Sequence, residues 1–164
     1  MVWKIGEGDA YALLGELLAE TGEVDPLPGI ARTEKGKPYF PERPGLHFSV
    51  SHSGELALCA LGEGALGADV ERVRKRGADL PRYALSDGEY AWFLAQGGRW
   101  EDFYTLWTMK EARVKCTGEG IFHRSVRRVS VPLIKPGERA RWEGFVFTAL
   151  AGEGWRGAIC EENS

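Results

Sequence analysis

The chain has 164 residues, of which 43% are hydrophobic and 27% charged, and its formal net charge is −3. This composition is typical of a soluble globular protein that forms one domain, or two small halves packed as one. The slightly acidic balance argues against nucleic acid or an anionic membrane as the main partner. No stretch reaches the ~20 apolar residues of a membrane span and the N-terminus lacks a cleavable signal pattern, so we expect a cytoplasmic protein.

The first part of the chain predicts a helix, a long loop and a pair of strands. Residues 10–20 carry leucines at helical spacing, and Thr-Gly follows them. Residues 23–45 contain five of the eight prolines, which excludes a helix and predicts a loop. Within this loop we expect a short extended piece around residues 30–33 and a turn at GKP. Strands are expected over 46–50 and 56–61, joined by a turn at SHSG.

The second part of the chain mixes helices and strands. Helices are expected over 85–95 and 101–116, after a basic loop over 72–77. Strands are expected over 65–70, 126–132, 145–150 and 156–160.

A helix, a Thr-Gly stop and an antiparallel hairpin occur twice along the chain, first around LLGELLAETG and again around MKEARVKCTG. This repeat favours an α+β fold of two similar halves related by a pseudo-twofold axis, residues 1–66 and 67–164, with a cleft between them. The alternative is that α+β folds often reuse such units without any symmetry.

Three cysteines occur, Cys59, Cys116 and Cys160, at wide spacings and without a CxxC pair. An odd number of such residues predicts reduced, mostly buried thiols. The three histidines show no HxxxH or HExxH spacing, so we do not expect a zinc site.

The sequence GADVER places two acids, Asp69 and Glu71, two residues apart in an expected strand. Such side chains point to the same face of a strand, where their like charges repel unless a positive group lies between them. The helix over 101–116 carries a stripe of residues spaced by four, namely Phe103, Trp107, Glu111 and Lys115.

If the aromatic end of this stripe packs in the core, Glu111 can face the two acids of the strand. Three carboxylates without histidine or thiolate favour Mg²⁺ over zinc, and Mg²⁺ often binds substrate phosphates as well. In the alternative interpretation, Glu111 and Lys115 form an ordinary surface ion pair, and the two acids form a solvated strand end.

The turn expected at SHSG brings Ser51, His52 and Ser53 together, where hydroxyls, an imidazole and backbone N–H groups can meet an anion. This signal is weak alone, because serine is common in turns. Lys37 in the GKP turn is equally unremarkable alone.

Four segments in this order, GKP, FSVSHSG, GADVE and WTMKEARVKCTG, resemble the 4′-phosphopantetheinyl transferases. The similarity is greater to the Sfp-type branch, whose single chain holds two similar halves, and it covers about residues 36–120. Ser49 stands where the branch usually has asparagine. Tyr11 and Ala12 stand where a basic residue is expected, and the N-terminal arm of the branch is shortened here.

The resemblance implies transfer of the phosphopantetheine arm of coenzyme A to a serine of a carrier protein, with release of 3′,5′-ADP. It implies that Asp69, Glu71 and Glu111 hold Mg²⁺, with Mn²⁺ as a possible substitute. Glu111, or a water that it orients, is the candidate base for the carrier serine.

The resemblance also assigns residues to the coenzyme A substrate. His52 and Lys115 are expected to contact its phosphate oxygens, with Ser51 nearby, and Lys37 is expected to reach its nucleotide end. The basic residue that usually binds the nucleotide end is missing here. We expect that Lys35, Arg32 or Lys4 binds the nucleotide end in its place. Lys110 either neutralises the site or is solvated, and the sequence favours neither.

The carrier protein is expected to be acidic and to dock on the basic residues of the 72–77 loop together with Arg82. A second basic cluster around residues 123–128, namely His123, Arg124, Arg127 and Arg128, is more simply an ordinary surface. The aromatic side chains of Tyr90, Trp92 and Phe93 either form an apolar dock or pack in the core.

Two other functions use the same residues. One is a non-catalytic module that binds coenzyme A or a carrier, and the other is a Mg²⁺-dependent hydrolase of pyrophosphate-bearing cofactors. Two complete halves in one chain also predict an active monomer.

Overall fold

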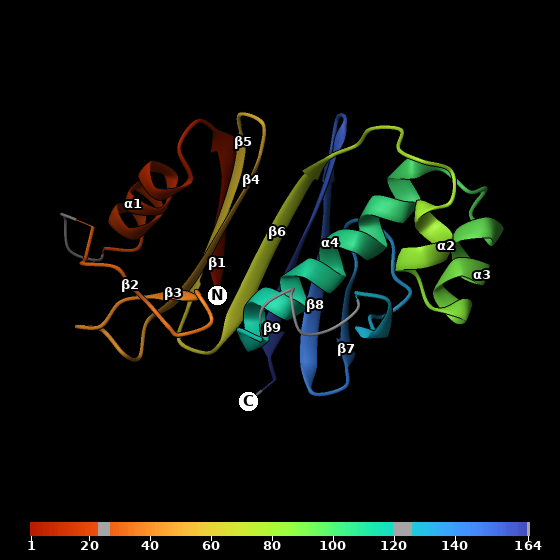
Figure 1. Cartoon of the computed structure of the whole chain (residues 1–164). Helices are drawn as coiled ribbons and strands as arrows, with labels where there is room; N and C mark the ends of the chain where they lie inside the picture. Colours follow the sequence, from red (N-terminus) through yellow and green to blue (C-terminus); the bar gives the residue numbers. More distant parts are fainter. Residues whose placement is uncertain (23–26, 120–125, 164) are drawn as a thin grey trace.

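The computed structural model describes residues 1–22, 27–119 and 126–163. It is an α+β fold with two larger antiparallel sheets, a two-stranded ribbon and four α-helices within these residues (Figure 1). None of the helices in the described part of the chain is long and apolar enough to cross a membrane.

The first sheet carries one helix. Its strands are β1 (Val2–Glu7), β4 (His47–Ser53) and β5 (Leu56–Gly62), in the order β1-β5-β4, and α1 (Ala10–Glu20) packs on them. The helix spans the predicted residues. It begins after Asp9, because the Asp9 carboxylate accepts hydrogen bonds from the Tyr11 and Ala12 N–H groups of its first turn. Its leucine face is buried with Phe40 and Phe48.

The second sheet has the order β6-β9-β8-β7, formed by β6 (Leu66–Arg72), β7 (Arg139–Trp142), β8 (Phe145–Gly152) and β9 (Trp155–Glu162). The long helix α4 (Trp100–Thr117) packs across β6 and β9 (Figure 1). Two shorter helices, α2 (Leu80–Ala84) and α3 (Asp87–Ala95), lie between β6 and α4 in the chain. In both sheets the first of these three strands in the chain pairs with the last, and the last pairs with the middle one, as the orders β1-β5-β4 and β6-β9-β8 show. The pseudo-twofold relation and the division at residue 66 stay predictions.

Gly67 sets the distance between α4 and β6. A Cβ atom at this position would lie 2.1 Å from the Ala112 carbonyl oxygen and 2.3 Å from the Cys116 nitrogen. Because both atoms belong to the α4 backbone, only glycine permits this approach. The contact holds the C-terminal half of α4 directly over the strand that carries the two acids.

Several predicted elements differ in the structure. The strand expected over 126–132 is wrong, because a 3-10 turn spans Val126–Arg128 and no strand follows before β7 in the described residues. The SHS segment lies inside β4 rather than in a turn, and only Gly54 and Glu55 connect β4 to β5. The ribbon of β2 (Ala31–Arg32) and β3 (Pro38–Tyr39) confirms the extended piece and turn around GKP. The edge strands β1 and β7 were not predicted, because they are largely exposed and lack a clear alternating pattern.

Candidate functional site

Serine side chains join the two sheets at the candidate site. Strands β4 and β6 lie side by side but belong to different sheets. Each serine that alternates along β4 accepts a hydrogen bond from a backbone N–H of β6. The pairs are Ser49 with Ala68 at 2.9 Å, Ser51 with Val70 at 3.3 Å and Ser53 with Arg72 at 3.0 Å. The serine hydroxyls take the place of the backbone carbonyls that would accept these hydrogen bonds within a sheet. Because the residue numbers of the partners rise together along both strands, β4 and β6 run parallel.

The same hydroxyls hold the two acids of β6. Ser51 donates to the Asp69 carboxylate at 3.0 Å, and Ser53 donates to the Glu71 carboxylate at 3.0 Å. The expectation that Asp69 and Glu71 share one face of the strand is therefore confirmed. Ser51 and Ser53 are buried or nearly so, which assigns them to this junction rather than to an exposed turn.

Lys115 of α4 is the positive group beside Asp69. Its ammonium lies 2.8 Å from Asp69 Oδ1 and also donates to the Ser51 hydroxyl at 2.9 Å. Asp69 is 4% exposed, and its burial raises the pKa of its carboxyl group while the charge of Lys115 opposes this rise. The ammonium of Lys115 thus reduces the repulsion between Asp69 and Glu71.

Glu111 brings a third carboxyl group to the same place. It is 6% exposed, and burial together with the charge of Asp69 raises the pKa of Glu111 to about 7. Burial and the Asp69 charge also raise the pKa of Glu71. Glu111 lies one helical turn before Lys115, whose ammonium contacts Asp69, so the three carboxyl groups lie in one neighbourhood with a single lysine between them.

The carboxyl groups fit a hard cation by their chemistry. Asp69 Oδ2 is buried and has no hydrogen-bond partner among the residues that the structure describes, which leaves one ligand oxygen available beside the neighbouring carboxylates. As the side chains stand, no three His, Cys, Asp or Glu residues in the described part of the chain are close enough to ligate one ion. Lys115 instead supplies the cation at Asp69 Oδ1.

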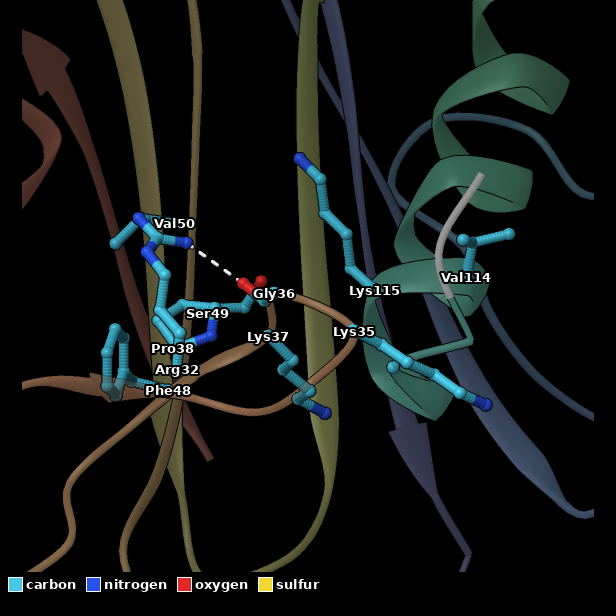
Figure 2. Close-up of a pocket in the computed structure, with 11 residues that line it drawn as sticks. Arg32, Lys35, Gly36, Lys37, Pro38, Phe48, Ser49, Val50, Val114 and Lys115 are labelled. Atoms are coloured by element: carbon cyan, nitrogen blue, oxygen red, sulfur yellow. Dashed lines mark hydrogen bonds between the residues drawn. The ribbon is translucent and has the colours of Figure 1, made fainter. Parts of the chain in front are cut away.

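A pocket of about 370 Å³ adjoins this cluster. Figure 2 shows that its walls come from the β2–β3 region, from β4 and from the end of α4. Phe48 and Val50 supply apolar surface, and four cationic side chains border the space, namely Arg32, Lys35, Lys37 and Lys115. An apolar pocket with a cationic rim suits a ligand with an aromatic part and several anionic groups.

Lys37 ties the GKP turn to the end of α4. Its ammonium donates to the carbonyl of Cys116 at 2.5 Å, and its stem packs on Gly118, where an added Cβ would lie 3.1 Å from Lys37 Cδ. Gly118 ends the helix with a φ of 68°. A cation at this end is favourable because the last carbonyls of a helix carry partial negative charge.

Arg32 lies at the other side of the pocket and is held in place. It donates to the Gly36 carbonyl at 2.9 Å (Figure 2). It also donates to the Tyr11 hydroxyl at 3.2 Å. Tyr11 thus positions an arginine from a different segment at the pocket. Lys4, by contrast, forms ion pairs with Glu16 and Glu20 of α1 and does not line the pocket.

His52 lies on the opposite face of β4 from the three serines. Strand alternation places it with Phe48 and Val50, which line the pocket, although His52 itself does not. Its contact with phosphate stays a prediction.

Lys110 takes neither of the two places expected from the sequence. It is fully buried, and its ammonium forms an ion pair with Glu89 at 2.7 Å. It also donates to the carbonyls of Val126 and Val129 at 3.2 and 2.6 Å. Glu89 was not recognised from the sequence, although its spacing from Ser86 is that of a capping box, which the structure contains.

The basic loop expected to dock a partner is exposed. Arg72, Arg74, Lys75 and Arg76 all lie at the surface, and so does Arg82. In the second basic cluster, His123 and Arg124 lie outside the described residues, and Arg127 donates to the carbonyls of Arg82 and Leu85 and to Asp87. Of the candidate docking aromatics, Phe93 is a core residue and the other two pack against the same core.

Comparisons with known proteins agree with the motifs. The sequence model of the 4′-phosphopantetheinyl transferase superfamily matches residues 65–160. The chain is 33% identical over 152 residues to a 4′-phosphopantetheinyl transferase of Bacillus subtilis, covering 87% of this chain and 64% of that protein.

Two further relatives cover shorter segments. Identity is 36% over 90 residues with 4′-phosphopantetheinyl transferase Sfp of Bacillus subtilis (strain 168), covering 54% of this chain and 40% of that protein. It is 43% over 108 residues with 4′-phosphopantetheinyl transferase AcpT of Escherichia coli (strain K12), covering 62% and 54%. The chain therefore spans less than two thirds of the length of these curated relatives.

Proposed function

Because the chain belongs to the 4′-phosphopantetheinyl transferase superfamily, we propose that it transfers the 4′-phosphopantetheine arm of coenzyme A to a serine of a carrier protein, with release of 3′,5′-ADP. The observation that carries this proposal is the junction of the acidic cluster with the cationic pocket. The acidic cluster holds an excess of negative charge, and the cationic pocket suits a nucleotide with several phosphates.

Coenzyme A is proposed to bind in the pocket between the β2–β3 region and α4. Lys115 lies at the pocket and binds phosphate oxygens, with Ser51 within hydrogen-bonding distance of Lys115, and Lys37 reaches the nucleotide end. Arg32 and Lys35 supply the grip on the nucleotide end. Arg32 is the stronger candidate of the two, because Tyr11 and the Gly36 carbonyl already hold its guanidinium in place.

Asp69, Glu71 and Glu111 are proposed to hold Mg²⁺, or Mn²⁺ in its place. The unpartnered Asp69 Oδ2 and the raised pKa of Glu111 support this assignment, because both reflect a site with too little positive charge. A bound Mg²⁺ supplies charge neutralisation for the pyrophosphate as the bond to the arm breaks. Lys115, which lies between Asp69 and the pocket, would contribute its charge to the phosphate oxygens.

Glu111 is the proposed acceptor for the proton of the carrier serine, either directly or through a water that it orients. In the metal-free protein, burial and the charge of Asp69 raise the pKa of Glu111 to about 7, so its carboxyl group can exchange a proton near neutral pH. As a ligand of a cation it would be a weaker base, and that favours the water as the group that takes the proton. His52, which lies on the same face of β4 as Phe48 and Val50, is proposed to contact a phosphate oxygen as well.

The carrier is proposed to be acidic and to dock on the exposed basic loop and Arg82, which lead directly from β6 into α2. The protein is proposed to act as a monomer in the cytoplasm.

The test is intact-mass spectrometry of apo carrier proteins incubated with this protein, coenzyme A and Mg²⁺. Carriers from fatty-acid, polyketide and peptide synthesis would be compared. A gain of one phosphopantetheine mass that is lost with EDTA and in Glu111→Gln is expected. Glu101→Gln, at the other end of α4, is the matched control and should keep the activity.

Other outcomes point to the alternative functions. Binding of coenzyme A without carrier modification would replace the transferase by a non-catalytic binding module. Release of free phosphopantetheine without any carrier would identify a hydrolase. A protein that neither binds nor converts coenzyme A would refute the assignment of the pocket.

A further inference from the structure

Two of the three cysteines face each other between α4 and β9. Cys160 of β9 is the register partner of Gly67 in β6, so both positions present the same face of the sheet. Gly67 is pressed against the backbone of α4 at Cys116, which shows that this is the face covered by the helix. The two side chains are neighbours in one buried core cluster, and the Cys116 thiol donates to the carbonyl oxygen of Ala65 at 3.4 Å.

The two thiols differ in acidity. The neighbouring Cys160 thiol, followed by the nearby charge of Lys37, lowers the pKa of the Cys116 thiol against the effect of its burial. The neighbouring Cys116 thiol and burial raise the pKa of Cys160. Cys116 is therefore the thiol of the pair that peroxide is expected to attack first.

The third cysteine provides a contrast. Cys59 lies in β5, and burial raises the pKa of its thiol to about 11. Its sulfur contacts the carbonyl oxygen of Lys4 at 3.7 Å rather than another thiol. It is therefore the matched control for the pair.

From this geometry we infer that Cys116 and Cys160 form a redox-modification site, which peroxide converts to an intramolecular disulfide. The Cys116 thiolate attacks one peroxide oxygen, so that an S–O bond forms, the O–O bond breaks and hydroxide leaves. The Cys160 sulfur then attacks the Cys116 sulfenic acid, the S–O bond breaks, and the thiol proton leaves with the hydroxyl group as water. Two thiols are oxidised and one peroxide is reduced to two waters.

Access to the pair comes from the end of the helix. Cys116 lies in the last turn of α4, one residue before the helix ends at Thr117. Local opening of this last turn, which breaks the Lys37 hydrogen bond and the Gly118 cap, admits a small oxidant without global unfolding.

The modification is coupled to the pocket through Lys37. The ammonium of Lys37 is hydrogen-bonded to the carbonyl of Cys116, and Lys37 lines the pocket. Closing the disulfide draws the Cys116 sulfur away from the Ala65 carbonyl and toward Cys160, and it moves the Cys116 carbonyl that holds Lys37. Oxidation is therefore expected to weaken anion binding in the pocket, and this second consequence rests on the proposed function.

The disulfide is tested by thiol counting and intact mass after peroxide treatment of the whole protein. Wild type should lose about 2 Da and two of its three alkylatable thiols, leaving Cys59, and dithiothreitol should restore them. Cys59→Ala should form the same disulfide, whereas Cys160→Ala should not and should instead gain oxygen at Cys116. Three free thiols after oxidation, a disulfide to Cys59 or a disulfide between two molecules would overturn the inference.

The coupling is tested with 3′,5′-ADP, which has no thiol and cannot reduce the disulfide. After removal of peroxide, the oxidised protein should bind it about tenfold more weakly than the reduced protein, as expected for one lost phosphate contact. Equal affinities would overturn the coupling. Failure of the reduced protein to bind 3′,5′-ADP would count against the proposed function, whereas the disulfide is judged by mass alone.

Discussion

Replacing Lys110 by methionine is expected to destabilise the protein by about 3–5 kcal/mol, because the Glu89 carboxylate then loses its cation inside the protein. Lys110 is fully buried and Glu89 is 5% exposed, so water cannot take over the lost contact. The two backbone carbonyls that Lys110 holds, those of Val126 and Val129, also lose their donor. Methionine keeps most of the apolar volume, so the loss reports on the charge.

The matched variants are Glu89→Gln and the double variant. Glutamine keeps an oxygen for the Ser86 N–H, which Glu89 caps at 2.8 Å, and removes only the charge. Glu89→Gln alone should also be destabilising, since it leaves the Lys110 ammonium without its counter-ion. The double variant should cost at least about 2 kcal/mol less than the sum of the single variants, because neither charge is then left alone. Urea unfolding at neutral pH measures all four free energies, and additivity within about 0.5 kcal/mol would refute this account of the pair.

Three further predictions test the site. Gly67→Ala should cost about 1–3 kcal/mol in urea unfolding and impair coenzyme A binding, because its Cβ would meet the α4 backbone at 2.1 Å. Gly64→Ala should be nearly neutral, because no atom of the described residues lies within 4 Å of the added Cβ. In metal-free protein the raised pKa of Glu111 means that the folded state binds more protons than the unfolded state between about pH 4.5 and 7, so stability falls as the pH rises through this window. Glu111→Gln should abolish this fall and stabilise the metal-free protein at pH 8 by about 2–3 kcal/mol, and an unchanged pH profile of unfolding would contradict the assignment. Lys37→Met should weaken 3′,5′-ADP binding about tenfold in calorimetry, while Lys4→Met, paired with α1 away from the pocket, should not change it.

The sequence alone determined the features that repeat over a few residues. The helix over 10–20, the aromatic and charged stripe of α4, and the shared face of Asp69 and Glu71 all follow from periods of 3.6 or 2, which are properties of the local backbone. The ordered motifs identified the family for the same reason, since each is a short local pattern. These features were sufficient to select the three carboxylates and Lys115.

The tertiary structure decided which groups those residues meet. The alternating serines of β4 looked like a polar turn, but the edge of a second sheet lies beside them and their hydroxyls became its hydrogen-bond partners. Lys110 and Glu111 are neighbours in sequence, yet the helix turns one toward a buried acid of α3 and the other toward β6. Such contacts join residues that are far apart in the chain, and local periodicity carries no information about which distant element will cover a given face.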